Sequence, residues 1–273
     1  MFKISCFADE IAPEFDTQLH VMKQLGIQYL SLRSVWGKNV LDLTEEELTR
    51  IRKSLAASAV RVSSIGSPIG KVSIYEDFSS HLRRLERALS AAQRLEAGYV
   101  RVFSFYMDGE EPSRHEAEVI RRFETMAEMA AAADIVLLHE NEADIYGETS
   151  ARCLKLLQVV NNPHLRAAFD PANFVIAGED VLDTAWTRLK PFVEYMHIKD
   201  AKRDGTITPA GEGDGAIPLL LADLRDHASI FLTLEPHLSQ AGSMGGFTGP
   251  ELFATAYQAL VSALESQGLS DYV

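Results

Sequence analysis

The sequence contains only two cysteines in 273 residues, Cys6 and Cys153. Two cysteines cannot form a framework of disulfides, and these two lack the close spacing of zinc-finger ligands. Cys6 falls in an expected first strand and Cys153 in an expected helix. We therefore expect two small buried thiols and a fold that is held together by packing.

Lysine and arginine are also scarce: 26 stand against 39 aspartates and glutamates, which gives a net charge of −13. A nucleic-acid-binding face requires clustered positive charge, so we expect no nucleic-acid partner. No apolar run approaches the roughly 20 residues that span a bilayer, and residues 1–10 lack the charged-then-apolar order of a signal peptide. These absences predict a cytoplasmic protein that has no membrane partner.

What the sequence does contain is an alternation of short apolar runs with longer helical patterns. The apolar runs predict strands at about 2–7, 27–33, 60–65, 99–105, 135–140, 165–170, 193–199 and 230–235. Helices are predicted at about 14–25, 77–96, 114–133, 148–160, 180–189, 217–226 and 250–267. One further helix is predicted to begin at residue 44, between the second and third strands. Eight strand–helix repeats with near-continuous apolar strands favour a single (β/α)8 TIM barrel over residues 1–273, rather than an open doubly wound sheet.

Four consecutive expected strands end in a side chain that can bind a metal ion: Glu140, Asp170, His197 and Glu235. One such acid is usually a helix cap or an ion-pair partner, and one such histidine usually makes a hydrogen bond in the core. In a barrel, however, the carboxyl ends of all strands meet at one mouth, so the four side chains can converge there. Three carboxylates and one imidazole suit Mn, Mg, Co or Zn without selecting among them.

Several cations are expected near the same mouth, at or just after strand ends: Arg33, Lys71, Arg101, Lys199 and Arg203. They can hold a substrate carboxylate, phosphate or hydroxyl groups, or they can balance the charge of the acidic ligands. Lys199 is the strongest candidate for substrate binding, since strand alternation puts it on the face of His197. The segment Gly211–Gly215 is either an anion-binding nest or, as its two acids favour, a flexible active-site loop.

The remaining histidines divide by strand parity and by the elements that carry them. His139 has the parity opposite to Glu140, so we expect it to face the helix layer. His237 shares the parity of Glu235, which makes it a candidate for substrate contact. Histidines 20, 81, 115, 164 and 227 fall on helices or loops, and we expect them to be solvated.

Five motifs carry a resemblance to a known family: 139–142 (HENE), 170–174 (DPANF), 197–200 (HIKD), 211–215 (GEGDG) and 234–237 (LEPH). Together they resemble the xylose isomerase-like TIM-barrel superfamily over essentially the whole chain. More narrowly, they are similar to its sugar phosphate isomerase/epimerase branch, which includes ketose 3-epimerases and inosose isomerases or dehydratases.

The resemblance implies that Glu140, Asp170, His197 and Glu235 bind one divalent ion, with manganese favoured. It also implies that Glu140 and Glu235 act as base and acid on opposite faces of the substrate. Homo-oligomers are common in the family, so this chain is a candidate homo-oligomer. The resemblance assigns Arg203 to substrate binding, and the substrate-binding set that we expect is Lys199, Arg203, Asn173, Lys71, His237 and Arg33.

The sequence departs from the family pattern at two positions near the substrate. Asn173 stands where those epimerases carry a histidine that contacts substrate, and Ser31 stands where relatives often carry a glutamate. Both departures bear on the choice of substrate and reaction.

We therefore expect a metal-dependent isomerase or epimerase that acts on a small sugar or keto-sugar through an enediolate. A metal-dependent dehydratase, lyase or decarboxylase for an oxidised sugar is the alternative, because the same intermediate can expel a leaving group. A DNA-repair endonuclease on this fold would need more histidines and a basic face. A sugar-binding protein without catalysis is the remaining alternative.

Overall fold

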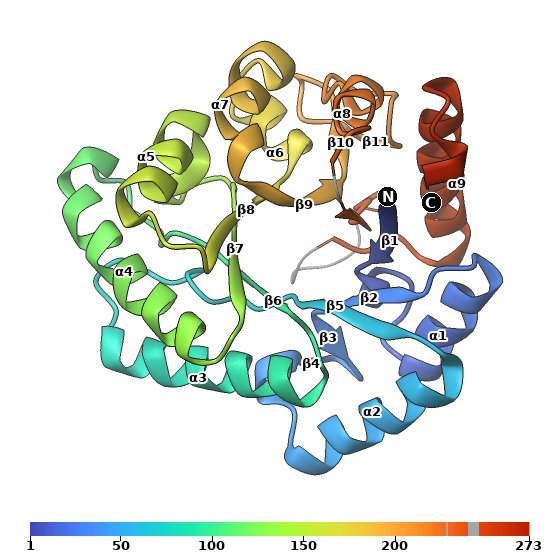
Figure 1. Ribbon diagram of the computed structural model, residues 1–273, viewed down its shortest axis with the longest axis horizontal. Coiled ribbons are helices and arrows are strands. Elements are labelled where there is room, and N and C mark those ends of the chain that lie inside the picture. Colours follow the sequence, from blue (N-terminus) through green and yellow to red (C-terminus); the bar gives the residue numbers. More distant parts are fainter. Residues whose placement is uncertain (228, 240–245, 273) are drawn as a thin grey trace.

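Eight parallel strands close into one barrel in the computed structural model, which describes residues 1–227, 229–239 and 246–272. Around the barrel the strands follow in the order β1, β12, β9, β8, β7, β6, β5 and β2 (Figure 1). Their bounds in chain order are β1 Phe2–Cys6, β2 Tyr29–Leu32, β5 Arg61–Ile65, β6 Tyr99–Val102, β7 Val136–Glu140, β8 Leu165–Phe169, β9 Val193–Ile198 and β12 Ile230–Leu234. The predicted (β/α)8 barrel is confirmed.

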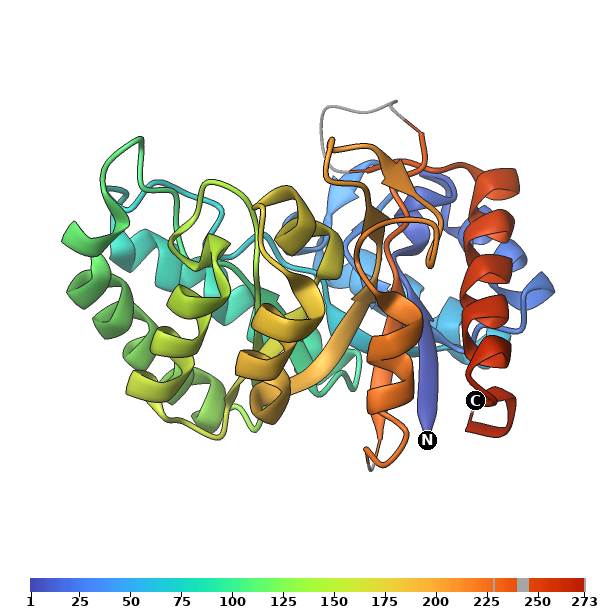
Figure 2. The same cartoon turned by 90° about the horizontal axis from the view of Figure 1, so that it is seen from above.

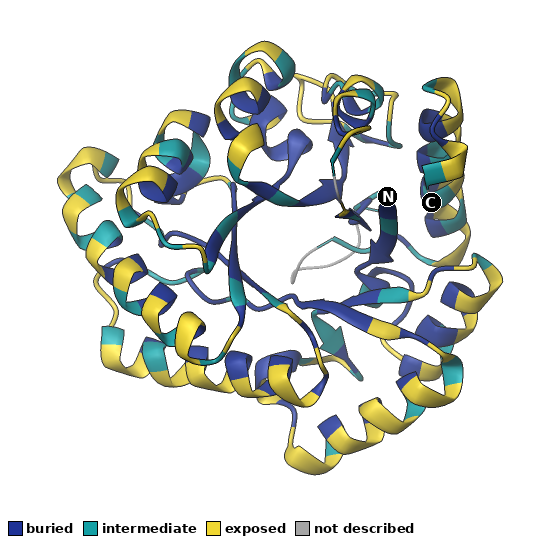
Figure 3. Cartoon of the chain, viewed as in Figure 1, coloured by how far each residue is buried: buried dark blue, intermediate teal, exposed yellow. Residues whose placement is uncertain are grey.

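Helices surround the strands and cover them from solvent. They are α1 Phe15–Gln24, α2 Glu45–Ser58, α3 Phe78–Arg94, α4 Glu116–Ala132, α5 Ser150–Val160, α6 Pro171–Ile176, α7 Thr187–Leu189, α8 Ile217–Asp223 and α9 Pro250–Ser266. The helices expose one face and bury the other, whereas the strands are buried almost throughout (Figure 3). This double burial explains why the strands appear as near-continuous apolar runs in the sequence. Within the described residues, no helix combines the length and the apolar character that crossing a membrane requires.

Local signals explain most element boundaries. Helix α2 begins with the capping box that its sequence predicts, in which Thr44 and Glu47 exchange side-chain and backbone hydrogen bonds. The helix expected at 180–189 is a π-helix over Val181–Trp186 that continues into α7. Helix α6 and two hairpins, β3–β4 (Ser34–Val35 and Lys38–Asn39) and β10–β11 (Asp200–Ala201 and Ile207–Thr208), were not predicted. Each of these elements is too short to show a periodic pattern in the sequence.

The barrel interior contains a hydroxyl network rather than only apolar side chains. The phenol oxygen of Tyr195 lies 2.9 Å from Ser63 Oγ and 3.1 Å from Ser64 Oγ. Ser5 and Ser31 continue the chain, each 2.6 Å from its serine partner on β5. Ser31 is therefore tied into the barrel wall by Ser64 and is fully buried.

His81 corrects one prediction, because this histidine is 5% exposed rather than solvated. It lies on the buried face of α3 with Leu85 and Ala88. Its Nε2 atom accepts a hydrogen bond of 3.1 Å from the backbone N–H of Gly70. Burial comes first among the causes that lower the pKa of His81 to about 4, so the side chain serves as a neutral acceptor in the core.

The carboxyl ends of the strands gather at one end of the barrel. Figure 2 shows β1 rising from the N-terminus toward this end, where the β10–β11 hairpin also lies. The carboxyl ends of neighbouring strands lie at nearly the same height along the barrel. Thr233 of β12 pairs with His197 of β9, and Glu140 of β7 pairs with Ala168 of β8. The residues that follow each strand therefore share one rim, as a parallel barrel requires.

Candidate metal centre

Four metal-capable side chains meet at the mouth of the barrel. Glu140 ends β7 and His197 lies next to the end of β9, while Asp170 follows β8 and Glu235 follows β12. They are 2, 1, 0 and 3% exposed, respectively. One possible ligand atom from each lies within 4.8 Å of the others. The structure thus brings together the four residues that the sequence predicted as ligands.

His197 is at the centre of this cluster. Its Nδ1 atom lies 2.9 Å from Glu235 Oε2, 3.3 Å from Glu140 Oε1 and 3.8 Å from Asp170 Oδ2. Burial alone would lower the pKa of His197, but the carboxylates of Glu140 and Glu235 outweigh it and raise the pKa well above its usual value. The cluster therefore favours positive charge at its centre.

The residues present fit a divalent cation. Glu140 Oε2, His197 Nδ1 and Glu235 Oε2 are buried, and none makes a hydrogen bond within the described part of the chain. Leaving buried polar atoms unsatisfied costs free energy, which a cation between them would recover. Three oxygen donors and one nitrogen donor form a ligand set for Mn, Mg, Co or Zn.

Asn141 holds Asp170 in position, and sequence reasoning missed this role. The Asn141 side chain donates to the backbone carbonyl of Asp170 at 2.9 Å and accepts from its N–H at 3.0 Å. Oδ1 of Asp170 caps α6 by accepting from the Asn173 N–H at 3.0 Å. The other carboxylate oxygen, Oδ2, is left to face His197 and Lys199.

A cavity of about 590 Å³, here called the mouth cavity, opens above the cluster. Two ligands, Glu140 and Glu235, line it together with four permanent cations, Arg33, Lys71, Arg101 and Lys199. Two further carboxylates in its lining are Asp9 and Glu142. Asp9 and the adjacent Glu10 follow the first strand, so they repeat the acid-tipped pattern that identified the ligands, although sequence reasoning did not select them.

Most of the cations already have close carboxylate or amide partners. Arg33 donates to Asp9 at 2.7 Å and to Glu235 at 2.8 Å. Lys199 donates to Asn173 Oδ1 at 2.8 Å and lies 3.4 Å from Asp170. Asn173 therefore supports a lysine.

His237 and Arg203 differ in their placement. His237 lines the mouth cavity, and its Nε2 atom lies 3.2 Å from Glu10 and 3.5 Å from Glu235. Burial acts to lower the pKa of His237, but Glu10 and Glu235 raise it to about 9. Arg203 is exposed in the β10–β11 turn and is outside the lining of this cavity.

Glu10, Glu235 and His237 form a second group with metal-ligand spacing. Arg33 already brings positive charge to this group, because its guanidinium contacts Glu235 and lies 3.7 Å from Glu10. We therefore interpret this second group as an ion-pair network around Arg33. The candidate metal centre is the cluster of Glu140, Asp170, His197 and Glu235.

The segment Gly211–Gly215 is an anion-binding nest, and its anion is a side chain of the same protein. The buried carboxylate of Asp200 accepts backbone N–H groups from Gly211, Gly213 and Gly215 at 2.8–3.1 Å. A Cβ atom at Gly213 or Gly215 would collide with this carboxylate. The nest, which the sequence favoured less than a flexible active-site loop, is therefore present, and it holds Asp200 at the start of β10.

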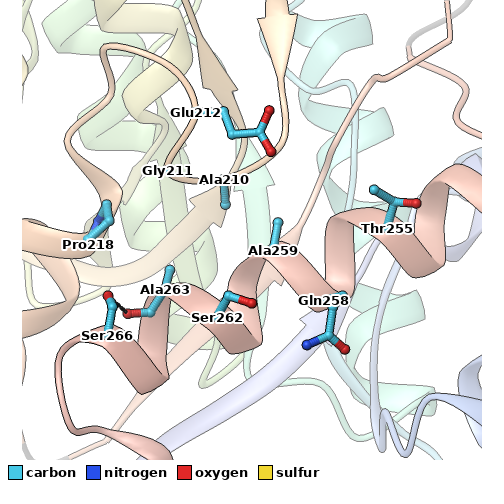
Figure 4. Close-up of a pocket in the computed structure, with 10 residues that line it drawn as sticks. All are labelled: Ala210, Gly211, Glu212, Pro218, Thr255, Gln258, Ala259, Ser262, Ala263 and Ser266. Carbon is cyan, nitrogen blue, oxygen red and sulfur yellow. Dashed lines mark hydrogen bonds between the residues drawn. The ribbon is translucent and has the colours of Figure 1, made fainter.

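A second hollow, of about 550 Å³, lies on the outside of the barrel between α9 and the loop before α8 (Figure 4). Its α9 side consists of Thr255, Gln258, Ala259, Ser262, Ala263 and Ser266. It shares no lining residue with the mouth cavity, and Glu212 is its one charged lining residue.

The fold and the converging ligands define a (β/α)8 barrel that has a candidate divalent-metal centre at its carboxyl mouth. The family model described as "Xylose isomerase-like TIM barrel" matches residues 19–262, and the chain belongs to this family.

Three relatives illustrate the range of the family. A 3-dehydroshikimate dehydratase of Bacillus anthracis is 21% identical over 198 residues, which cover 68% of this chain and 70% of that protein. The crystal structure of a D-tagatose 3-epimerase-like protein has a TM-score of 0.76 at 14% identity, covering 98% of both chains. The structure of the IOLI protein with a binding zinc atom has a TM-score of 0.76 at 14% identity, covering 97% of this chain and 99% of that one. The structural matches show a shared fold.

Proposed function

We propose that this protein is a divalent-metal-dependent isomerase or epimerase that acts on a small sugar or keto-sugar. One observation carries the proposal. Glu140 and Glu235 come from different strands, β7 and β12, and both place a carboxylate oxygen within 3.3 Å of His197 Nδ1 in one buried cluster. Two carboxylates beside a candidate metal centre are what a reaction needs when it removes a proton and returns it elsewhere.

The reaction begins with removal of a proton from the carbon that is bonded to the carbonyl carbon and that bears a hydroxyl group. When bound, a divalent ion supplies Lewis acidity that lowers the cost of the resulting enediolate. One of Glu140 and Glu235 takes the proton, and the other returns a proton to the opposite face or to the neighbouring carbon. The first outcome is epimerisation. The second is isomerisation, in which the hydroxyl proton also moves to the former carbonyl oxygen, so that the carbonyl and hydroxyl groups exchange places.

Positive side chains complete the proposed site. Burial lowers the pKa of Lys199, but Asp170 and Glu235 outweigh it and raise the pKa above its usual value, so the ammonium keeps its charge. Lys199 can then donate to a substrate oxygen while Asn173 holds it. Lys71, Arg33 and His237 line the same mouth cavity. Arg203 belongs to the proposed site only if the β10–β11 turn brings it inward.

A dehydratase for an oxidised sugar is the second candidate. The four permanent cations of the mouth cavity favour it, since they suit a substrate that carries a carboxylate. The curated relative from Bacillus anthracis is named a dehydratase. In this reaction the same proton removal is followed by loss of water instead of proton return.

Metal analysis combined with solvent exchange tests both candidates. The manganese-loaded protein would be incubated in D2O with D-tagatose, D-psicose, D-fructose, inososes and 3-dehydroshikimate. Deuterium incorporation without elimination supports the isomerase or epimerase, and loss of water supports the dehydratase. Each of Glu140→Gln and Glu235→Gln should reduce the rate by about 10²–10⁴-fold. Full activity in both variants would rule out the acid–base pair.

A further inference from the structure

The ring of strands divides into two halves with different chemistry. The metal-capable residues lie at or just after the carboxyl ends of β7, β8, β9 and β12, which are consecutive in the barrel. The other four consecutive strands, β6, β5, β2 and β1, carry cations and aromatic rings at the same rim. A substrate that reaches the metal centre therefore has this second half beside it.

The second half forms an alternating stack, here called the cation–aromatic wall: Arg33, Phe7, Arg101, Phe103 and Lys71. The guanidinium carbons of Arg33 and Arg101 lie 4.7 and 4.8 Å from the centre of the Phe7 ring. Phe103 then lies 4.9 Å from Arg101 and 4.3 Å from the Lys71 ammonium. Cation–π contacts of this kind fix the planes and positions of charged groups.

The cations of the wall differ in how fully their donors are used. Arg33 makes two short hydrogen bonds to carboxylates, at 2.7 and 2.8 Å. Arg101 makes only two long ones, each of 3.5 Å, to Glu235 and to the Gly66 carbonyl. Its Nε atom has no hydrogen-bond partner in the described chain, although the side chain is only 8% exposed. Arg101 is thus a fixed guanidinium with unused donor capacity.

The carboxylates nearest to Arg101 are themselves candidate metal ligands. Its NH1 group lies 3.2 Å from Glu140 and 3.5 Å from Glu235. A metal ion would draw negative charge from both carboxylates and weaken their hold on the guanidinium. Lys71 is paired with Glu142 at 2.9 Å, yet its side chain is 34% exposed, so it is accessible from the cavity.

We propose that Arg101, assisted by Lys71, binds a carboxylate of the substrate, so that the enzyme acts on a small sugar or keto-sugar that carries a carboxylate. This inference rests on the proposed function and specifies its substrate class. A planar guanidinium matches a planar carboxylate through two parallel hydrogen bonds. A doubly charged phosphate fits less well, because Glu140, Glu142 and Glu235 line the same cavity and would repel it.

Matched pairs of unreactive probes test the subsite on the manganese-loaded full chain. Shikimate and its methyl ester differ only in the carboxylate charge, and calorimetry would measure the dissociation constant of each. The wild type should bind shikimate about 10- to 100-fold more tightly than the ester, as expected for a charge-assisted pair. Arg101→Met should abolish this preference for the acid. Arg101→Lys should retain part of the preference, and Lys71→Gln should reduce it.

Arg52→Met removes an exposed arginine of α2 and should leave the ratio unchanged. A merely structural role for Arg101 would weaken the binding of the acid and of the ester equally.

Equal binding of the two compounds by the wild type overturns the proposal, as does a preference for the acid that persists in Arg101→Met. D-glucitol 6-phosphate and D-glucitol, which lack a carbonyl group and cannot react, form a second pair, and a phosphate preference larger than the carboxylate preference also overturns it. If the protein binds shikimate more tightly than its methyl ester but exchanges deuterium into no compound, the carboxylate subsite is supported and the isomerase function is rejected.

Discussion

Nδ1 of His197 lies 2.9 Å from Oε2 of Glu235, and neither atom makes a hydrogen bond within the residues that the structure describes. Two polar atoms at this distance attract each other through a proton or through a cation held between them. Because Glu140 and Asp170 add two more carboxylates to the same cluster, a divalent cation matches the charge better than a single proton does.

Metal binding should therefore stabilise the folded protein. At a free Mn²⁺ concentration of about 100 times Kd, linkage gives about 2.7 kcal/mol. For a chain of this size we expect the melting temperature to rise by about 5–10 °C. Thermal unfolding with Mn²⁺ and with EDTA measures the shift. Asp170→Asn should remove most of it, whereas Asp204→Asn in the exposed β10–β11 turn should preserve it. An equal shift in Asp170→Asn would contradict the assigned ligand set.

Asn141→Ala should weaken metal binding without removing a ligand. Asn141 holds the backbone of Asp170 through two hydrogen bonds, and groups that orient a ligand are typically worth 10- to 100-fold in metal affinity. Titration of the metal-free variant with Mn²⁺ measures the loss. Asn162→Ala removes a side-chain hydrogen bond to the backbone N–H of His164, in the loop between α5 and β8 at the opposite end of the barrel, and serves as the control. Unchanged affinity in Asn141→Ala would show that Asp170 does not need this support.

Asp200→Asn should destabilise the protein because an amide cannot accept hydrogen bonds at both of its heavy atoms. Each carboxylate oxygen accepts two backbone N–H groups, so two donors would lose an acceptor. The amide can place its NH2 group toward Gly211 and Gly213, whose hydrogen bonds to Asp200 are only part-buried, so we expect a loss of about 1–3 kcal/mol in unfolding free energy. Urea denaturation checks this value. Gly213→Ala should be comparably destabilising, and a neutral effect in both variants would refute the role of the nest.

The barrel and the convergence of its four candidate ligands were predictable because their signals are local in the sequence. Double burial turns each strand into an apolar run, and the closure of the barrel brings the ends of these runs together. Glu140, Asp170, His197 and Glu235 could thus be selected from their positions at strand ends alone. Their convergence follows from topology and does not depend on side-chain detail.

The partners of these residues could not be predicted in the same way. Asp200 finds its donors 11 to 15 residues away in a loop, and Arg101 is held between rings that follow two different strands. Such contacts depend on loop conformation, which periodicity does not describe. Arg203 illustrates this limit, because the short β10–β11 hairpin carries it outward from the strand end that precedes it.

The burial of His81, in contrast, has a signal in the sequence. It stands four residues before Leu85 and seven before Ala88, which is the spacing of one helical face. The wrong prediction of a solvated histidine came from its placement on a helix, without regard to the face of the helix on which it lies. Helical spacing was the better guide at this position.

His81 should also make the protein more sensitive to acid. Its pKa is about 4 in the folded protein, where burial keeps it neutral, against about 6.5 in the unfolded chain. Below pH 6.5 the unfolded chain binds a proton that the folded chain rejects. The contribution of His81 is therefore fully present above pH 6.5 and is lost as the pH falls toward 4.

Between pH 7.5 and 5.0 this linkage amounts to about 2 kcal/mol. His81→Gln keeps an acceptor for the Gly70 N–H but cannot be protonated, so its unfolding free energy should fall by about 2 kcal/mol less than that of the wild type over this range. Urea denaturation at the two pH values measures the difference, which remains informative even if the glutamine packs less well. His20→Gln, at an exposed position of α1, should follow the wild type. An identical acid sensitivity in His81→Gln and the wild type would mean that His81 is protonated in the core, against the neutral acceptor role that its bond to Gly70 assigns.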